Sequence, residues 1–519
     1  MTEQGSPAGE IAAGYTSEGA ALELGAVVID GQADPSAAVR LPLATLNRHG
    51  LVAGATGTGK TKTLQLVAEQ LSAAGVPVVL ADVKGDLSGL AAAGEANDKV
   101  SKRSQELGDD WAGTAFPVQF LSLGTGGKGS PIRATITSFG PVLLSKVLGL
   151  NETQESTLGL IFHWADQRGL ALLDTKDLRS VITHLTSDEG KADLKGIGGV
   201  SAATAGVILR SLSNLEAQGG EDFFGEPELD VHDLMRAADG KGVVTLLELD
   251  NLQAKPALFS TFLMWLLAEL FEELPEEGDL DKPKLVFFFD EAHLLFNDAS
   301  KAFLERIEQT VKLIRSKGVG VFFCTQLPTD IPNNVLSQLG ARIQHALRAF
   351  TPDDQAALAK TVKTYPKTKF YELDTALTSL GIGEAIVTVL SERGAPTPVA
   401  WTRLRAPRSK MGSIGAEAVA SAVASSDLHT KYGETIDRES AYEKLAAKVA
   451  APAPEAAPDA PAPAPEPESA PSPAPKQEKD DPGFIESAMK NPAVKSFMRS
   501  AASALGREIT RGLFGNRKR

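Results

Sequence analysis

Residues 54–61 read Gly-Ala-Thr-Gly-Thr-Gly-Lys-Thr and fit the pattern G-x-x-x-x-G-K-[ST]. Glycines let the backbone N–H groups of such a loop turn inward around phosphate oxygens. The apolar stretch 51–53 is typical of a buried strand, and the apolar residues that follow the loop have helical spacing. A strand, a glycine-rich loop and a helix in this order place a helix N-terminus against an anion. The stretch therefore predicts a phosphate-binding loop rather than an ordinary glycine-rich turn.

The residues of this loop have distinct expected roles. Lys60 is expected to reach the β- and γ-phosphates of a nucleotide, and the Thr61 hydroxyl is expected to bind Mg²⁺. We expect ATP as the nucleotide and Mg²⁺ as its cofactor. The predicted nucleotide-binding residues are Gly54, Ala55, Thr56, Gly57, Thr58, Gly59, Lys60, Thr61 and Lys62.

Composition limits the class of protein. A chain of 519 residues should hold two or three domains, and 43% apolar residues are enough for a sizeable core. A single cysteine excludes a disulfide framework and favours a reducing cytoplasm. Residues 257–271 are apolar but too few to span a membrane, so we expect a buried helix and not an integral membrane protein. The net charge of −14 argues against a uniformly basic nucleic-acid surface but leaves room for a local basic channel.

A second motif supplies the carboxylates that a phosphate loop needs. Residues 284–293 read KLVFFFDEAH, an apolar run that predicts a buried strand with two acidic residues at its end. Ligands of open α/β sheets bind at the carboxyl edge of the strands. Asp290 is expected to hold Mg²⁺ indirectly, by binding the ligands that contact the ion. Glu291 is expected to be the general base that orients the attacking water. The alternative is a buried strand followed by acidic residues at a helix N-terminus.

A third apolar run ends in polar residues. Residues 318–326 read GVGVFFCTQ and predict another buried strand, in which Cys324 belongs to the core. If the core is RecA-like, this strand lies between the phosphate-loop strand and the strand before Asp290. Gln326 would then sense the γ-phosphate, and its alternative role is that of an ordinary strand-end cap.

The order of the predicted elements indicates a doubly wound α/β fold. Strand signals alternate with helical ones, which implies a mainly parallel sheet. The Pro- and Ala-rich composition after residue 446 predicts an extended linker, and a basic amphipathic tail follows it with eight basic and two acidic residues. The predicted divisions are a short β-rich region 1–48, a first core part 49–139, a helical insertion 140–235, a second core part 236–410, a helical extension 411–445, a linker 446–483 and a tail 484–519.

Six segments resemble the HerA-like branch of the HerA/FtsK P-loop ATPases, and in particular its YjgR-type members. The block IRSKGVGVFFCTQLPTDIPNNVLSQLGARIQHALRAFTPDD, 314–354, is the most specific of them. The other five are LVAGATGTGKTKTLQ, DVKGDLSGLA, GLNETQESTLGLIFHWAD, KPKLVFFFDEAHLLF and GIGEAIVTVL. The resemblance covers roughly residues 30–410. The letters DEAH do not indicate the helicase class named for them, because the chain after residue 330 is too short for a second RecA-like domain.

The resemblance implies a RecA-like core that assembles as a homo-hexameric ring, with ATP sites between subunits and double-stranded DNA moved through the ring. Ring ATPases usually place an arginine of one subunit at the γ-phosphate of the next. Arg342 and Arg348 are the catalytic candidates, Arg315 is a further one, and an ordinary ion pair is the alternative for each. The short N-terminal region departs from the DNA-end-processing relatives, which carry a larger β-barrel there. Asp82, Lys84 and Asp86 are expected at the active-site edge, either supporting the water, lining the ring or forming a solvated turn.

Two classes of cargo stay open at this stage. A motor that moves double-stranded DNA is favoured by the 314–354 block and by the basic tail. An ATPase that acts on protein cargo, or a nucleotide-gated scaffold, is favoured by the acidic core and the missing barrel. A small-molecule kinase fits least, because of the long insertion and Gln326. The tail itself could contact DNA or an anionic membrane, or bind a protein partner.

Overall fold

The computed structural model describes residues 5–194, 198–249, 256–278, 280–296 and 301–450. These form two compact units, each of which is described by itself. The first unit holds residues 5–134, 146–150 and 211–436, and the second holds 135–145, 151–210 and 437–450. The predicted basic tail and all but the first residues of the predicted linker lie outside the described residues.

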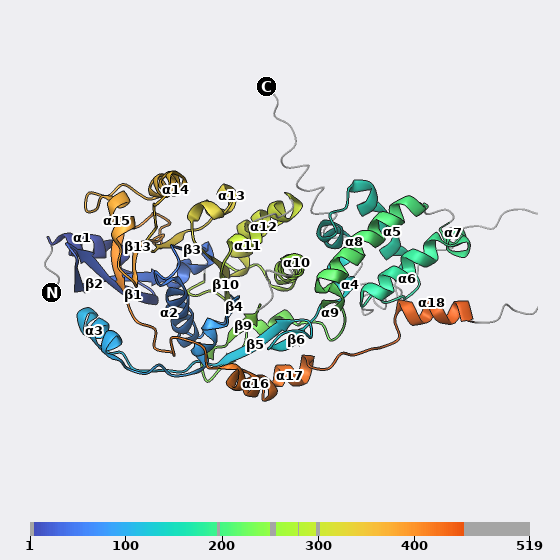
Figure 1. The fold of residues 1–519 in the computed structure, drawn as a ribbon, viewed down its shortest axis with the longest axis horizontal. Coiled ribbons are helices and arrows are strands. Elements are labelled where there is room, and N and C mark those ends of the chain that lie inside the picture. Colours follow the sequence, from blue (N-terminus) through green and yellow to red (C-terminus); the bar gives the residue numbers. More distant parts are fainter. Residues whose placement is uncertain (1–4, 195–197, 250–255, 279, 297–300, 451–519) are drawn as a thin grey trace, which may run out of the picture. The chain divides into compact units, whose positions relative to one another are not determined.

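A twelve-stranded sheet is the core of the first unit in the described chain (Figure 1). From β12 to β6 the strands run parallel, and the four strands at the other side are antiparallel. This confirms the predicted RecA-like, mainly parallel architecture. The spatial order is β2 (Gln32–Pro42), β1 (Ala21–Ile29), β14 (Ala400–Leu404), β13 (Glu384–Thr388), β12 (Ala341–Gln344), β3 (Gly50–Ala53), β11 (Val319–Thr325), β10 (Leu285–Phe289), β4 (Val78–Asp82), β9 (Val244–Glu248), β5 (Val118–Leu123) and β6 (Ser130–Ile132). The β-rich N-terminal region thus supplies an edge hairpin to this sheet.

Helices cover both faces of the sheet, and the central strands are consequently apolar throughout. Alternate residues of a strand point to opposite faces. On one face, Val286 and Phe288 belong to the core cluster that contains Leu64 and Val67 of α2 (Lys60–Ala73). On the other face, Phe289 packs its ring against Phe259 of α10 (Pro256–Glu273) at 6.5 Å between centroids. The described part of the apolar run 257–271 is therefore a buried helix, as its sequence predicts.

The first unit also contains other helices and a two-stranded pair, all of them shorter than α2 and α10. They comprise α1 (Pro7–Ala12), α3 (Asp98–Leu107), α9 (Glu221–Phe223), α11 (His293–Phe296), α12 (Lys301–Leu313), α13 (Asn333–Leu336), α14 (Pro352–Val362), α15 (Leu373–Ser379), α16 (Ala416–Ala424), α17 (Asp427–Tyr432) and the small pair β7 (Ala237–Ala238) and β8 (Lys241–Gly242).

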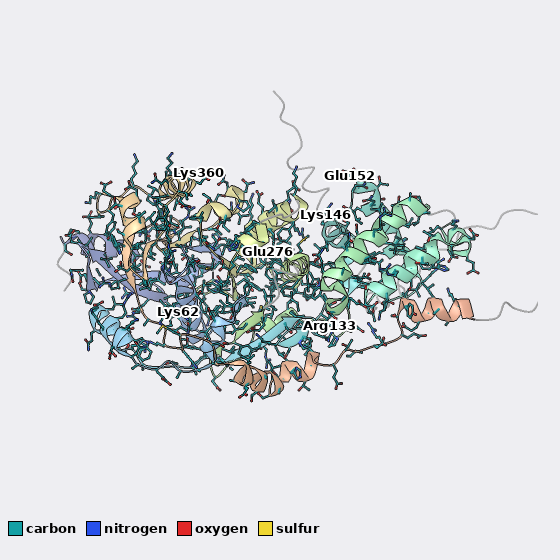
Figure 2. The ribbon with its side chains drawn as sticks, in the orientation of Figure 1. Lys62, Arg133, Lys146, Glu152, Glu276 and Lys360 are labelled. Atoms are coloured by element: carbon teal, nitrogen blue, oxygen red, sulfur yellow. The ribbon has the colours of Figure 1, made fainter. Side chains whose placement is uncertain are left out.

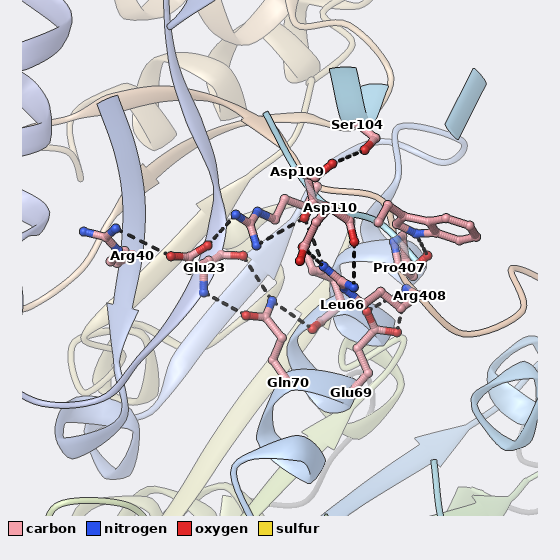
Figure 3. A network of polar contacts seen from close by, with 12 residues as sticks. Glu23, Arg40, Leu66, Glu69, Gln70, Ser104, Asp109, Asp110, Pro407 and Arg408 are labelled. Atoms are coloured by element: carbon pink, nitrogen blue, oxygen red, sulfur yellow. Dashed lines mark hydrogen bonds and ion pairs between the residues drawn. The ribbon is translucent and has the colours of Figure 1, made fainter. Parts of the chain in front are cut away.

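A polar network fixes α2 to the segment that follows β14 (Figure 3). The buried Glu69 carboxylate of α2 accepts hydrogen bonds from the backbone N–H groups of Arg408, at 2.7 Å, and Ser409, at 3.0 Å. Arg408 also pairs with Asp110 at 2.8 Å. The next residue, Gln70, donates to the carbonyl of Glu23 in β1 at 3.1 Å. The helix that begins at the phosphate loop is thereby held from two sides.

The second unit is helical. Its helices are α5 (Glu152–Gln167), α6 (Thr175–Thr186), α7 (Asp188–Asp193), α18 (Ala441–Ala450) and most of α4 (Ile136–Val147) and α8 (Ala202–Leu215). Trp164 is fully buried, with its ring 5.3 Å from that of His184. The buried Asp177 of α6 accepts hydrogen bonds from Ser440 at 2.5 Å and from the Tyr442 N–H at 2.8 Å. The start of α18 is therefore tied to the first turn of α6.

His49 precedes β3 and joins three segments of the first unit. Its Nε2 lies 2.6 Å from the Val311 carbonyl, and its Nδ1 accepts from the Val321 N–H at 3.1 Å. This pair of bonds requires the neutral ring. Burial lowers the pKa of His49 to about 4, whereas the unfolded chain binds the proton at an ordinary pKa near 6.5.

We expect the free energy of unfolding to fall between pH 7.5 and pH 5, since the unfolded state gains a proton there and folded His49 does not. The pKa difference makes this contribution about 2 kcal/mol at pH 5. Urea unfolding at the two pH values measures how much unfolding free energy each protein loses. The loss in His49→Gln should be smaller than the loss in wild type by about that amount. The exposed His163→Gln is the control, because other titrating groups are common to all three proteins. Equal losses in wild type and His49→Gln would contradict this role of His49.

Candidate functional site

The phosphate loop lies between β3 and α2, as predicted, and its start is pinned to both neighbouring strands. The Gly54 N–H donates to the carbonyl of Thr325, at the end of β11, at 3.2 Å. The Ala55 N–H donates to the carbonyl of Ala346, just beyond β12, at 2.8 Å. Gly57 and Gly59 have φ values of 82° and 117°, a region that favours glycine. The loop therefore has a defined path set by the sheet below it.

His345 packs against the phosphate loop, a role that was not predicted from the sequence. It is fully buried, and its Nε2 lies 2.8 Å from the Thr63 hydroxyl in the first turn of α2. Burial lowers the pKa of His345 to about 4, and the Lys60 charge adds to this effect. A side chain at Gly54 would place its Cβ 2.5 Å from the Cβ of His345. The glycine at 54 is thus required by a close approach as well as by its φ of 151°.

Lys60 bends back over its own loop. Its buried Nζ donates to the carbonyl of Gly54 at 2.7 Å and to that of Ala55 at 3.3 Å. Thr61 is half-buried in the first turn of α2. Lys62, labelled in Figure 2, donates to Gln65 at 3.1 Å. Burial lowers the pKa of Lys62, and the negative charges of Asp86 and Asp82 oppose part of this shift.

The two acidic residues lie at the carboxyl end of β10. Asp290 is buried and accepts a hydrogen bond from the Glu291 N–H at 2.9 Å. Burial raises the pKa of Asp290, and the neighbouring Glu291 charge raises it further. Glu291 has a φ of 50°, which is uncommon for a residue with a side chain and marks stored backbone strain. Since α11 (His293–Phe296) begins two residues after Glu291, the alternative of acidic residues before a helix start also fits this position.

The loop after β4 reaches the same carboxylates. Asp82 is buried, and its two oxygens accept the backbone N–H groups of Lys84, Gly85 and Leu87 at 2.8–3.1 Å. This residue builds the loop, so a solvated turn is the wrong reading for Asp82. Lys84 extends from the loop and donates to Glu291 Oε1 at 2.6 Å. The hydrogen bond to Glu291 raises the pKa of Lys84.

The β11 strand lies between β3 and β10, as predicted from the sequence for a RecA-like core. Gln326 follows its last residue and is exposed at the carboxyl edge. The loop beyond is braced by Asp330, which accepts from the Thr325 hydroxyl at 2.6 Å and from the Leu327 N–H at 2.9 Å. Cys324 is buried, as expected for a core residue, and burial raises the pKa of its thiol.

The three candidate arginines lie in different surroundings. Arg342 of β12 donates to the carbonyl of Thr364 at 3.1 Å. Arg348 is exposed and donates to the carbonyl of Thr56 in the phosphate loop of its own chain at 3.2 Å. Arg315 is exposed and precedes β11, which places it at the opposite edge of the sheet from the loop. Within one chain, only Arg348 of the three is brought to the phosphate loop.

The donor set suits Mg²⁺, which prefers oxygen ligands and is commonly held by one or two protein groups together with phosphates. The Thr61 hydroxyl and the Asp290 carboxylate are such groups. Among the described residues no cluster of three or more His, Cys, Asp or Glu side chains could hold a metal by itself. An ion shared with a nucleotide is the arrangement that this chain fits.

None of the helices in the described part of the chain is long and apolar enough to cross a bilayer.

Gly54→Ala should lower the melting temperature, because the added methyl group meets His345 and the backbone disfavours a side chain. The cost should exceed about 1 kcal/mol. Gly159→Ala is the matched control, because it lies within α5 with open space around it and should stabilise the helix by about 1 kcal/mol. Melting followed by circular dichroism measures both. Equal melting temperatures for wild type and Gly54→Ala would contradict the packing described here.

Comparisons with known proteins address the fold and the family. Among solved structures, the bacterial conjugative coupling protein TrwBdeltaN70 is 15% identical, with a TM-score of 0.49 over 79% of this chain and 95% of that chain. VirB4 of Thermoanaerobacter pseudethanolicus is 15% identical, with a TM-score of 0.46 over 75% of this chain and 98% of that chain. The search of curated proteins found no match. The family model described as "Helicase HerA-like C-terminal" matches residues 28–519. Since this match spans most of the chain, the protein belongs to the helicase HerA-like C-terminal family.

Proposed function

We propose that this protein hydrolyses ATP with Mg²⁺ and couples the reaction to movement as a ring-forming motor. The observation that carries the proposal is the convergence of three strand ends. The phosphate loop follows β3, Gln326 follows β11 and the Asp290–Glu291 pair follows β10, and these strands are consecutive in the sheet. The family match supports a P-loop NTPase.

In this proposal the phosphates lie on the loop from Gly54 to Lys62. Lys60 exchanges its contacts with the loop carbonyls for the β- and γ-phosphate oxygens. Thr61 would bind Mg²⁺ directly, and Asp290 would hold the ion through the ligands that contact it. The ion would neutralise charge that develops on the transferred group. Glu291 accepts a hydrogen bond from the water whose oxygen attacks the γ-phosphorus, so that the bond to the ADP oxygen breaks. Gln326 contacts the γ-phosphate and reports its loss.

The arginines divide between two roles. Arg348 already contacts the loop of its own chain, so we assign it to the phosphates in the same subunit. An arginine that acts on a neighbouring subunit must reach beyond its own site, and Arg342 and Arg315 are the candidates that lie away from the loop. A homo-hexameric ring would supply that neighbour.

We propose double-stranded DNA as the cargo. The family description and the basic residues of the tail 484–519 support this choice. The second candidate is a protein cargo. The net charge of −14 favours that alternative, because an acidic surface repels phosphate groups.

Lys60→Ala should abolish ATP turnover, since the phosphates lose their main cation. Glu291→Gln should bind ATP as tightly as wild type and hydrolyse it about 10²–10⁴-fold more slowly, because the amide cannot accept a proton. Phosphate release and binding of a fluorescent ATP analogue measure the two effects separately. Lys99→Ala, on the exposed start of α3, is the control. Normal turnover by Glu291→Gln would show that another residue is the base.

Linear double-stranded DNA at moderate salt should raise the steady-state ATPase rate several-fold, with Glu291→Gln as the blank. Removal of 484–519 should abolish this stimulation and leave the basal rate unchanged. Higher salt should weaken the stimulation steeply, because binding to DNA phosphates releases counterions. A blank-corrected rate that does not respond to DNA would instead favour the protein cargo.

A further inference from the structure

The register of two strands brings Lys84 to Glu291. In the parallel pair of β4 and β10, Ala81 lies opposite Phe289. Continuing the register by two to three residues places the loop after Asp82 beside Glu291. The Lys84 Nζ then lies 2.6 Å from Glu291 Oε1. The contact therefore follows from the sheet and from the buried Asp82, which fixes the loop.

The two oxygens of Glu291 have different surroundings. Oε1 is taken by the ammonium of Lys84, whereas Oε2 is buried with no hydrogen-bond donor at bonding distance among the described residues. The Nδ1 of His293 is 3.5 Å from Oε2, beyond the usual length of a hydrogen bond. One oxygen is thus anchored, and the other still has its acceptor capacity.

The backbone of Glu291 also limits how its side chain can move. Glu291 has a φ of 50°, and the next N–H, that of Ala292, donates to the Cys324 carbonyl of β11 at 2.7 Å. A strained residue persists only where its surroundings hold it. The Glu291 side chain, 13% exposed, is held at its backbone by β11 and at its carboxylate by Lys84.

We propose that Lys84 is a positioning residue for the hydrolytic step: by holding Oε1 it fixes the orientation in which the Glu291 carboxylate meets the attacking water once ATP is bound. The proposal rests on ATP hydrolysis with Glu291 as the base. Lys84 acts through Glu291 and does not take part in phosphate binding. A general base works only in the correct geometry, and a displacement of about 1 Å can cost about 10²-fold in rate.

An ordinary surface ion pair is the competing explanation, and such pairs contribute little to stability. The pair of Lys369 with Glu10 is the matched example in this chain, with the same type of contact at 2.7 Å and both side chains more than half exposed. Lys369→Met should change neither turnover nor nucleotide binding. The two lysines thus separate a role in catalysis from a generic effect of removing an ion pair.

The test measures kcat and ATP affinity of the full-length protein with Lys84→Met, Lys84→Arg and Lys369→Met. Lys84→Met should lower kcat about 10²-fold while the Kd of a fluorescent ATP analogue stays within about twofold. Lys84→Arg should recover part of the rate because it keeps the cation. Melting temperature confirms folding, and Lys84→Gln replaces the Met variant if that one fails to fold.

Four results would overturn the inference. A kcat close to wild type would make the pair incidental, and an increased kcat would mean that Lys84 restrains the base. A parallel loss of ATP affinity would place Lys84 on the phosphates instead. If the wild-type protein shows no more ATP turnover than Lys60→Ala does, the proposed hydrolysis itself is wrong. The role of Lys84 then fails as well. The wild-type and Lys60→Ala pair therefore distinguishes the failure of the function from the failure of this inference.

Discussion

The parallel pairing of β3, β11 and β10 is the constraint on which the site depends. Parallel strands end at one edge of a sheet, so three loops that are far apart in sequence meet there. The pairing is supported by apolar side chains on both faces, and helices such as α2 and α10 cover those faces. The phosphate loop, Gln326, the Asp290–Glu291 pair and Lys84 each follow the end of one of these strands or of its neighbour β4. The chemistry is therefore a consequence of the register, and small shifts of one strand would separate its parts.

Burial of polar groups around the loop is the second element of this design. His345 and Asp290 both lie in the sheet edge with little access to water, and both titrate away from their ordinary pKa as a result of burial. Buried polar groups of this kind require fixed partners, and the Thr63 hydroxyl and the Glu291 N–H supply them. The network of Glu69 holds the far half of α2 in the same manner. The loop is thus preorganised by its supports, which limits the reorganisation that ligand binding requires.

The elements of the core could be predicted from local patterns, and the contacts between them could not. Apolar runs bounded by glycine and acidic residues identified β3, β10 and β11 closely, and the pattern around Lys60 identified the loop. The position of His345 under Gly54 depends on the pairing of β12 with β3, about 290 residues apart in the chain, which periodicity does not reveal. The available local signal was a lone histidine in the mostly apolar stretch ARIQHAL, 341–347. Lys84 was placed at the correct edge, but its partner followed only from the register of β4 with β10.

The uneven charge distribution along the chain determines where a DNA cargo could bind. The tail carries an excess of basic residues, so the rest of the chain is more acidic than the net charge of −14 indicates. A ring with this average charge would repel the phosphate backbone unless basic side chains gather along its lumen. The alternative is that the basic residues of the tail supply the attraction from outside the ring. Under that arrangement the tail raises the local concentration of DNA at the ring, and the core needs only enough affinity to move what the tail delivers. An acidic core and a DNA cargo are then compatible.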